Sequence, residues 1–257
     1  MPVPHPTLSI VTVVKDDLPG LLKTQSSLVG QTSQNFEWVI VDGSGASAET
    51  GSATDHLSIP NNYLWLAPTG IYPAMNTGLN RALGDYVWFI NAGDLVADEF
   101  TVEELLKVLN KHRPSWLVGQ VEFTHPDGST VTPPPFDYQA EKKRLFARGR
   151  FPPHQGTIAR KSILRELDGF NEDFHIAADY EMALRLSLIA DPIVLPENLA
   201  RFSVGGVSSS NWTRSLKEFR SARHSVFDIR GARRLHEAVD SFKVYASMFM
   251  ARLLRRA

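Results

Sequence analysis

The sequence of 257 residues contains no cysteine. A chain without cysteine forms no disulfide, holds no metal ion through thiolates and has no cysteine nucleophile. Any metal ion that it binds must therefore be held by oxygen or imidazole ligands. The chain also lacks an apolar run as long as a transmembrane helix, and residues 1–7 lack the basic and apolar parts of a signal peptide. We therefore expect a cytoplasmic protein.

Two glycine-rich nucleotide motifs are absent as well. No Gly-x-Gly-x-x-Gly follows the first predicted strand, and no Gly-x-x-x-x-Gly-Lys-Ser/Thr occurs in the chain. These absences argue against a dinucleotide-binding fold and against a P-loop. Hydrophobic residues make up 43% of the chain, which is enough for a real core. The length fits one large domain or one domain with a tail.

Acidic and basic residues are unevenly distributed. From Ser208 onward there are 11 Lys and Arg against 4 Asp and Glu, which leaves 16 against 24 before it. The basic end predicts contact with an anionic surface, and we favour a membrane because no nucleic-acid-binding motif accompanies it. Apolar residues recur there at three-four spacing, which predicts a helix that packs on its own domain, forms a homodimer seam or lies on a membrane. They are Leu235, Val239, Phe242, Ala246, Phe249 and Leu253.

The first part of the chain alternates between predicted strands and helices. Residues 8–14 and 36–41 are β-branched, apolar runs. The apolar stripe of residues 18–29 predicts a helix between them, with Pro19 in its first turn. Such a βαβ unit is right-handed and makes the sheet parallel. Residues 63–66 predict a third strand.

The segment 69–94 is the centre of this pattern. Gly84 is expected to end a helix as a C-terminal cap would, and residues 86–90 predict a buried central strand. The polar sequence Asn91-Ala92-Gly93-Asp94 follows at the carboxyl end of that strand. The helical stripe consists of Ile71, Met75, Leu79 and Ala82.

The carboxyl ends of three predicted strands carry candidate site residues, and this is the edge at which an open α/β sheet binds its ligands. They are residues 12–17, Asp42 and Asp94. A carboxylate at position 42 can accept a hydrogen bond from a base N–H or a ribose hydroxyl, and the alternative is a solvated turn residue. Asp94 is well placed for chemistry, and the alternative is that it caps a loop or the next helix.

The second part of the chain departs from the simple alternation. Thr101 to Glu104 resembles a capping box before a helix through Leu109, and residues 116–123 predict a strand that turns back as a hairpin at residues 126–129. Prolines bracket residues 133–153, which predicts a mobile insertion over one end of the sheet. Three further short strands are expected at 157–159, 193–195 and 199–203, the last two at an edge.

Candidate functional residues also occur in this second part. His154 lies in a loop beside the predicted site, although most lone histidines are structural. Asp179 and Glu181 open a predicted helix, where an acidic residue is expected as the N-cap, and either carboxylate could serve as a general base. The turn from Gly205 to Ser208 is rich in backbone N–H groups and can contact a phosphate.

These motifs together resemble the family 2 glycosyltransferases of the GT-A fold, over roughly residues 7–210. The resemblance is closest to bacterial members that build polysaccharides, lipopolysaccharide or glycolipids. It implies an α/β fold with a mostly parallel, Rossmann-like central sheet flanked by helices, a catalytic domain at 1–210 and a basic amphipathic helical tail at 211–257. The matching segments are 9–14 (SIVTVV), 39–44 (VIVDGS), 70–78 (GIYPAMNTG), 84–86 (GDY), 91–94 (NAGD), 153–156 (PHQG), 169–172 (GFNE), 178–181 (ADYE) and 205–208 (GGVS).

The resemblance also implies roles for particular residues. Asp179 would act as the base of an inverting transfer, and Asp94 would reach a Mg²⁺ or Mn²⁺ that bridges the donor diphosphate. Thr12 and Asp42 would hold the base and ribose, while His154 and Gly206 would contact the diphosphate or the acceptor. The other positions expected at the substrate are Val14, Asp16, Gly70, Met75, Asn76, Asn91, Ala92, Gly93, Gln155 and Glu181.

Two departures from the family pattern narrow the function. Asn91 and Gly93 occupy places often held by Asp, so metal binding is expected to be weaker than usual. The Gln-x-x-Arg-Trp motif of processive members is missing, which favours transfer of a single sugar. The expected donor is a UDP- or dTDP-sugar, with a GDP-sugar left open, and the expected acceptor is a glycan or a lipid-linked molecule at the inner membrane face. The alternatives are a nucleotide-sugar-binding protein with an inactive site and a nucleotidyltransferase.

Overall fold

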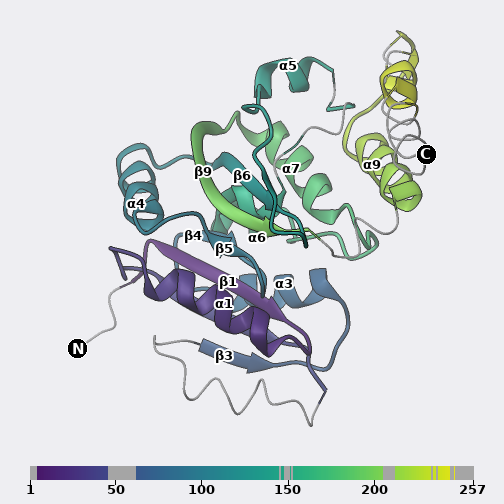
Figure 1. Ribbon diagram of the computed structural model, residues 1–257. Helices are drawn as coiled ribbons and strands as arrows, with labels where there is room; N and C mark the ends of the chain where they lie inside the picture. The colour runs from purple at the N-terminus through teal and green to yellow at the C-terminus, as the bar shows by residue number, and fades with distance from the viewer. Residues whose placement is uncertain are drawn as a thin grey trace.

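One continuous sheet runs through the protein (Figure 1). The computed structural model describes residues 5–45, 62–144, 146–147, 151, 153–204, 212–232, 234–235, 237–243 and 246. The strands lie in the order β3-β2-β1-β4-β8-β6-β9-β5, and β7 pairs with β6. Their bounds are β1 Leu8–Val14, β2 Glu37–Asp42, β3 Asn62–Trp65, β4 Tyr86–Phe89, β5 Leu95–Val96, β6 Trp116–Thr124, β7 Thr130–Val131, β8 Thr157–Arg160 and β9 Ile193–Ser203.

The first half of the sheet is parallel, as the sequence predicts. β1 pairs with both β2 and β4, and β2 pairs with β3, all in parallel. The register sets Val14 opposite Asp42 and Asp42 opposite Trp65, so the carboxyl ends of three strands meet at one edge. Antiparallel β8 joins this half to β6.

Helices cover both faces of the sheet, and each face has its own core. Along β1, Val11 and Val13 belong to one cluster of buried side chains, whereas Leu8, Ile10 and Val14 belong to the other, because neighbouring residues of a strand point to opposite faces. Helices α1 (Leu18–Val29) and α4 (Thr101–His112) cover the second cluster, and α3 (Ile71–Arg81) and α7 (Ala178–Ile189) cover the first.

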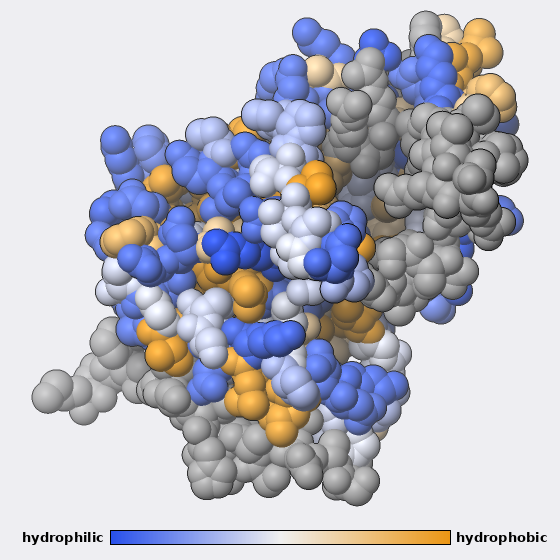
Figure 2. Space-filling model, in the orientation of Figure 1, coloured by the Kyte–Doolittle hydropathy of each residue, from blue (hydrophilic) through white to orange (hydrophobic). Residues whose placement is uncertain are grey.

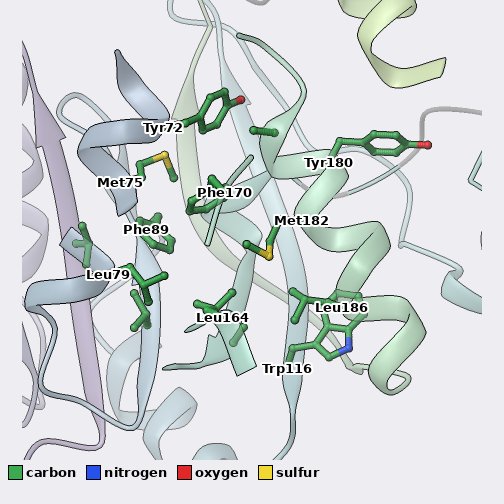
Figure 3. Close-up of a cluster of buried hydrophobic side chains, with 14 of the residues drawn as sticks. Tyr72, Met75, Leu79, Phe89, Trp116, Leu164, Phe170, Tyr180, Met182 and Leu186 are labelled. Atoms are coloured by element: carbon green, nitrogen blue, oxygen red, sulfur yellow. The ribbon is translucent and has the colours of Figure 1, made fainter. Parts of the chain in front are cut away.

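The core under α3 and α7 is rich in aromatic and sulfur-containing side chains (Figure 3). Met75 and Leu79 of α3 lie beside Phe89 of β4 in this view, and Phe170 packs edge-on against Phe89 with ring centroids 5.0 Å apart. Met182 reaches the same core from α7. The loop before α7 is therefore fixed to the central strand.

Three expectations about helix ends are wrong. Helix α4 has Phe100 as its N-cap without a side-chain hydrogen bond, because the Thr101 hydroxyl donates to Asp98 instead of forming a capping box. Helix α3 ends with Ala82 as its C-cap, and Gly84 instead lies against the backbone of Ser9. The N-cap of α7 is Ala177, which leaves Asp179 inside the first turn.

Two further expectations about the second half need correction. The two short strands expected at 193–195 and 199–203 are one strand, β9, which lies between β6 and β5. The described part of 133–153 is packed against the core, since Tyr138 and Phe146 are buried and Tyr138 lies edge-on against Trp116 of β6. This region contains helix α5 (Tyr138–Lys143). The short helices η1 (His154–Gly156) and α6 (Lys161–Glu166) flank β8.

The described part of the predicted tail packs on the rest of the protein. Helix α9 (Trp212–Val226) lies beside α7, and its Arg223 forms a buried ion pair of 2.7 Å with Glu237. Burial alone would raise the pKa of Glu237, but hydrogen bonds from Arg223 and Ser241 hold it below its usual range. No helix within the described residues is long and apolar enough to cross a membrane. Phe249 and Leu253 of the predicted stripe lie outside the described residues.

Candidate active site

A cleft of about 660 Å³ opens at the carboxyl ends of β1 and β4. It is bounded by the start of α1, the residues before α3 and the end of β9, so segments distant in sequence build its walls. Lys15 and Lys23 supply positive charge there. The predicted site residues that line the cleft are Val14, Gly70, Asn91, Ala92, Gly93 and Asp94.

Asp42 is held at the end of β2 by two hydrogen bonds. Its carboxylate accepts from the Ser44 amide at 2.8 Å and from the Tyr63 hydroxyl at 2.9 Å. Burial and the bond to Asp42 raise the pKa of Tyr63 to about 12, so Tyr63 remains a donor. The same Ser44 accepts a hydrogen bond from the amide of Asp16, which ties the ends of β1 and β2 together.

The loop 91–94 is fixed by Thr24 of α1. The Thr24 hydroxyl lies 2.8 Å from the carbonyl of Asp94 and 3.2 Å from that of Asn91, and it accepts from the amide of Gly93 at 3.1 Å. Gly93 has φ of 92°, a conformation that favours glycine. One hydroxyl thus sets the shape of the whole loop.

Asp94 is a buried carboxylate, with 4% of its surface exposed. It accepts hydrogen bonds from Gln155 Nε2 at 2.6 Å and from the Ser203 amide at 3.3 Å. Burial nevertheless raises the pKa of Asp94 to about 6, since two neutral donors offset only part of the cost of burying a charge. The carboxylate is therefore poised to gain from a cation.

The residues around Asp94 fit one side of a divalent cation site. The carboxylate is a hard oxygen ligand, and Gln155 Oε1 is a second oxygen that is buried without a hydrogen-bond partner. No group of three or more His, Asp or Glu that could hold a metal ion occurs in the part of the chain that the structure describes. Asp94 and Gln155 would therefore supply only some of the ligands of a cation at this place.

Asp179, His154 and Asn91 form a line from the first turn of α7 to the cleft at the carboxyl ends of β1 and β4. Nδ1 of His154 lies 3.4 Å from Asp179 Oδ2, and Nε2 lies 2.9 Å from Asn91 Nδ2. With Asn91 donating to Nε2, the imidazole carries its proton on Nδ1 and donates it to Asp179. The other oxygen of Asp179 accepts from the amide of Tyr180 at 2.7 Å. His154 thus orients the carboxylate.

Glu218 of α9 lies near the candidate site, and sequence reasoning missed it. One of its oxygens accepts from the amides of His175, Ile176 and Ala177 at 3.1, 2.8 and 3.1 Å. These bonds, together with Arg214, hold the pKa of Glu218 below its usual range although burial would raise it. Glu218 therefore fixes the residues just before Asp179. No local motif indicated it, because it lies in the segment interpreted as a tail.

Four other predicted site residues serve the fold in this structure. Glu181 is held by Arg185 at 2.7 Å, which leaves Asp179 as the available carboxylate of the pair. Asn76 clamps the backbone of Phe170, Met75 is fully buried, and Thr12 accepts from Trp38 inside the core. Gly206 lies outside the described residues.

Comparison with known proteins identifies the family of this chain. The model of glycosyl transferase family 2 matches residues 9–168, so the chain belongs to that family. An uncharacterized glycosyltransferase of Mycobacterium tuberculosis is 29% identical over 215 residues, which cover 79% of this chain and 78% of that protein. A PGL/p-HBAD biosynthesis glycosyltransferase of Mycobacterium bovis is 28% identical over 197 residues, which cover 70% of this chain and 66% of that protein.

Solved structures show the same fold. Residues 1–349 of TarS from S. aureus, in complex with UDP-GlcNAc, align with a TM-score of 0.65 at 18% identity, over 86% of this chain and 65% of that one. The mannosyltransferase PcManGT from Pyrobaculum calidifontis, in complex with GDP-Man and Mn²⁺, aligns with a TM-score of 0.65 at 17% identity, over 95% of this chain and 70% of that one. The expected GT-A-like α/β fold is thereby confirmed.

Proposed function

We propose that this protein transfers one sugar from a nucleotide-diphosphate sugar to a hydroxyl of a glycan or lipid-linked acceptor, with inversion at the anomeric carbon. We place the sugar donor in the cleft at the ends of β1 and β4, which we call the donor cleft. The observation that carries the proposal is the line from Asp179 through His154 to Asn91, because it joins a carboxylate to the wall of this cleft. Among the described residues, no comparable link reaches Glu181, whose carboxylate forms an ion pair with Arg185.

Asp179 is suited to act as the general base. It lies in the first turn of α7, where His154 and the amide of Tyr180 each contact one of its two oxygens. It accepts the proton of the acceptor hydroxyl while that oxygen forms a bond to the anomeric carbon and the bond from this carbon to the diphosphate oxygen breaks. His154 keeps the carboxylate in place during this transfer.

The donor is held across the ends of β1, β2 and β4. Val14 and Gly43, the residue after Asp42, line the part of the cleft in which we place the nucleoside, and Lys15 and Lys23 offset charge on the diphosphate. The solved neighbours bind UDP-GlcNAc and GDP-Man. We favour a UDP- or dTDP-sugar, and a GDP-sugar is the alternative.

A Mg²⁺ or Mn²⁺ held by Asp94 belongs to the same proposal. When bound, the cation acts as a Lewis acid that offsets charge on the leaving diphosphate. The buried carboxylate, with its raised pKa, supports this role, because a cation would replace the missing positive partner. The few acidic groups nearby predict that tight binding requires the donor.

Donor binding tests this assignment directly. We expect isothermal titration calorimetry to show that the protein binds one class of nucleotide sugar in the presence of Mn²⁺. The same nucleotide sugar should bind more weakly when a chelator replaces Mn²⁺. Asp94→Ala should remove the metal-dependent part of the affinity. Asp85→Ala, an exposed carboxylate at the other end of β4, should bind like the wild type. The ligand role of Asp94 is refuted if its variant responds to Mn²⁺ as the wild type does.

The C-terminal tail is proposed to bring the enzyme to the inner face of the membrane. Leu235, Val239 and Phe242 are spaced to lie on one helical face, and they are 69%, 43% and 69% exposed. Glu237 and Ser241 point the other way, toward Arg223. Figure 2 shows hydrophobic residues at the surface in the upper right of the view, where this segment lies. Apolar side chains beside exposed basic residues suit an anionic bilayer.

Vesicle sedimentation distinguishes a membrane from a second copy of the chain. The wild type should sediment with vesicles that contain anionic lipid, and a variant with Leu235→Gln and Phe242→Gln should stay in the supernatant. Leu188→Gln, which removes an equally exposed leucine from α7, is the matched control. If the wild type is instead a dimer, and the double variant is a monomer that binds vesicles as the wild type does, then Leu235, Val239 and Phe242 form a dimer interface.

A further inference from the structure

A second cavity, open to solvent, has a volume of about 530 Å³. It is lined by β6, the proline-rich segment before α5, α5 itself, Phe151 and Pro153. Among the described residues, none lines both this cavity and the donor cleft. Its volume falls in the range of roughly 300–1,000 Å³ that is usual for small-molecule sites.

His154 connects the two spaces. Its ring bonds to Asn91 in the wall of the donor cleft, and the residue before it, Pro153, lines the second cavity. Phe151, also on the cavity wall, packs edge-on against Tyr180, the neighbour of Asp179, with ring centroids 6.3 Å apart. The candidate base therefore lies where the two spaces approach each other.

The wall of the second cavity combines apolar rings with a few polar groups. Phe136, Phe151 and the prolines at 133–135 supply flat, apolar surfaces. The buried carboxylate of Glu141 and the side chain of Gln120 supply polar atoms, and Gln120 uses its Nε2 to donate to the carbonyl of Pro196. The remaining Oε1 of Gln120 is an acceptor.

We propose that this cavity binds a sugar ring of the acceptor. A pyranose presents C–H groups on its faces, which pack against aromatic and proline rings, and hydroxyls at its edge, which donate to carboxylate and amide oxygens. An acyl chain fits less well, because it would set hydrocarbon against the carboxylate of Glu141 and the amide oxygen of Gln120, to which sugar hydroxyls can donate. The inference rests on the proposed transferase function and names the acceptor class as a glycan or a glycosylated lipid.

Saturation-transfer NMR with a panel of methyl glycosides tests the cavity without knowledge of the natural acceptor. The panel contains the α- and β-methyl glycosides of glucose, galactose, mannose, rhamnose and N-acetylglucosamine. We expect at least one of them to receive saturation from the wild type. Ala140→Phe, which fills the cavity from α5, should weaken the binding of that glycoside at least about tenfold. Gln120→Ala should weaken the same binding to a smaller degree.

Matched controls separate this proposal from the transferase assignment. Lys143→Phe adds the same ring to the exposed side of α5 and should bind the glycoside like the wild type. All variants should bind the nucleotide sugar with unchanged affinity, which also shows that they are folded. The proposal is overturned if the wild type binds the nucleotide sugar but none of the glycosides. It is also overturned if Ala140→Phe binds both the nucleotide sugar and the glycoside as tightly as the wild type does. If the wild type binds no nucleotide sugar, the proposed function itself is refuted.

Discussion

At the scale of single residues, the site depends on side chains that hold one another. Asp94 is the most informative of them, because its carboxylate is buried among neutral donors and its pKa is raised to about 6. An ionised carboxylate in such a place lowers the free energy of unfolding. Groups of this kind are concentrated at functional sites, where a bound ligand can offset the loss. The sequence places Asp94 correctly at the end of β4, but neither Gln155 nor Ser203 could be assigned to it from spacing.

Asp94→Asn should stabilise the metal-free protein at neutral pH. The folded-state pKa lies above the value of 3.8 for an unperturbed Asp, so this group favours the folded state most below pH 3.8 and loses that contribution as pH rises through about 6. This rise in the pKa of Asp94 corresponds to at most about 3 kcal/mol in the free energy of unfolding. The Gln155 amide can rotate to pair with the new Asn. Urea unfolding at pH 7.5 with chelator should show a gain of about 1–3 kcal/mol, whereas a loss would show that the carboxylate stabilises the fold.

Gly84→Ala should destabilise the protein by about 2 kcal/mol or more. A Cβ at this position would lie 2.6 Å from the backbone nitrogen of Ser9 and 2.8 Å from the carbonyl carbon of Leu8, and neither atom can move without shifting β1. Gly45→Ala is the control, because its Cβ would meet no atom of the described residues within 4 Å. Thermal unfolding of both variants checks this prediction, and equal melting temperatures would contradict it.

At the scale of elements, the helices were predictable and their partners were not. The stripes in 18–29 and 71–82 match α1 and α3 because each has a clear apolar face toward the sheet. Strand β9 was read as two short strands because Pro196 and polar residues interrupt its apolar pattern. The role of α9 depends on contacts across more than forty residues, such as Glu218 to Ile176, which no local pattern encodes.

Glu218→Ala should slow transfer without weakening donor binding. The variant leaves three backbone amides before Asp179 without their acceptor, which we expect to cost about 2–4 kcal/mol in the free energy of unfolding. Glu218→Gln keeps an acceptor oxygen and should show a smaller effect on both quantities. Glu166→Ala, at the exposed end of α6, is the control. If kcat stays at the wild-type value in Glu218→Ala, the helix does not position the base.

At the scale of the whole molecule, the sheet brings two parts of the chain to one site. The parallel half supplies the donor cleft, and its outline follows from the strand–helix pattern because parallel strands end at a common edge. In the other half, His154 and Asp179 could be named from the sequence only as candidates, and their roles came from the family resemblance, since β8 is a short antiparallel strand inserted between β4 and β6. The identities of the sugar and the acceptor depend on cavity walls, which residue spacing does not describe.

Transfer of labelled sugar by the wild type and by Asp179→Asn tests the central claim most directly. The assay supplies the nucleotide sugar that binds, with Mn²⁺, to an extract of glycans and lipids from the source organism. We expect the wild type to label the extract and Asp179→Asn to be slower by about 10²–10⁴-fold at unchanged donor affinity, because only proton removal is lost. Asp173→Asn, an exposed acid before α7, should behave like the wild type. Undiminished transfer by Asp179→Asn would contradict the account.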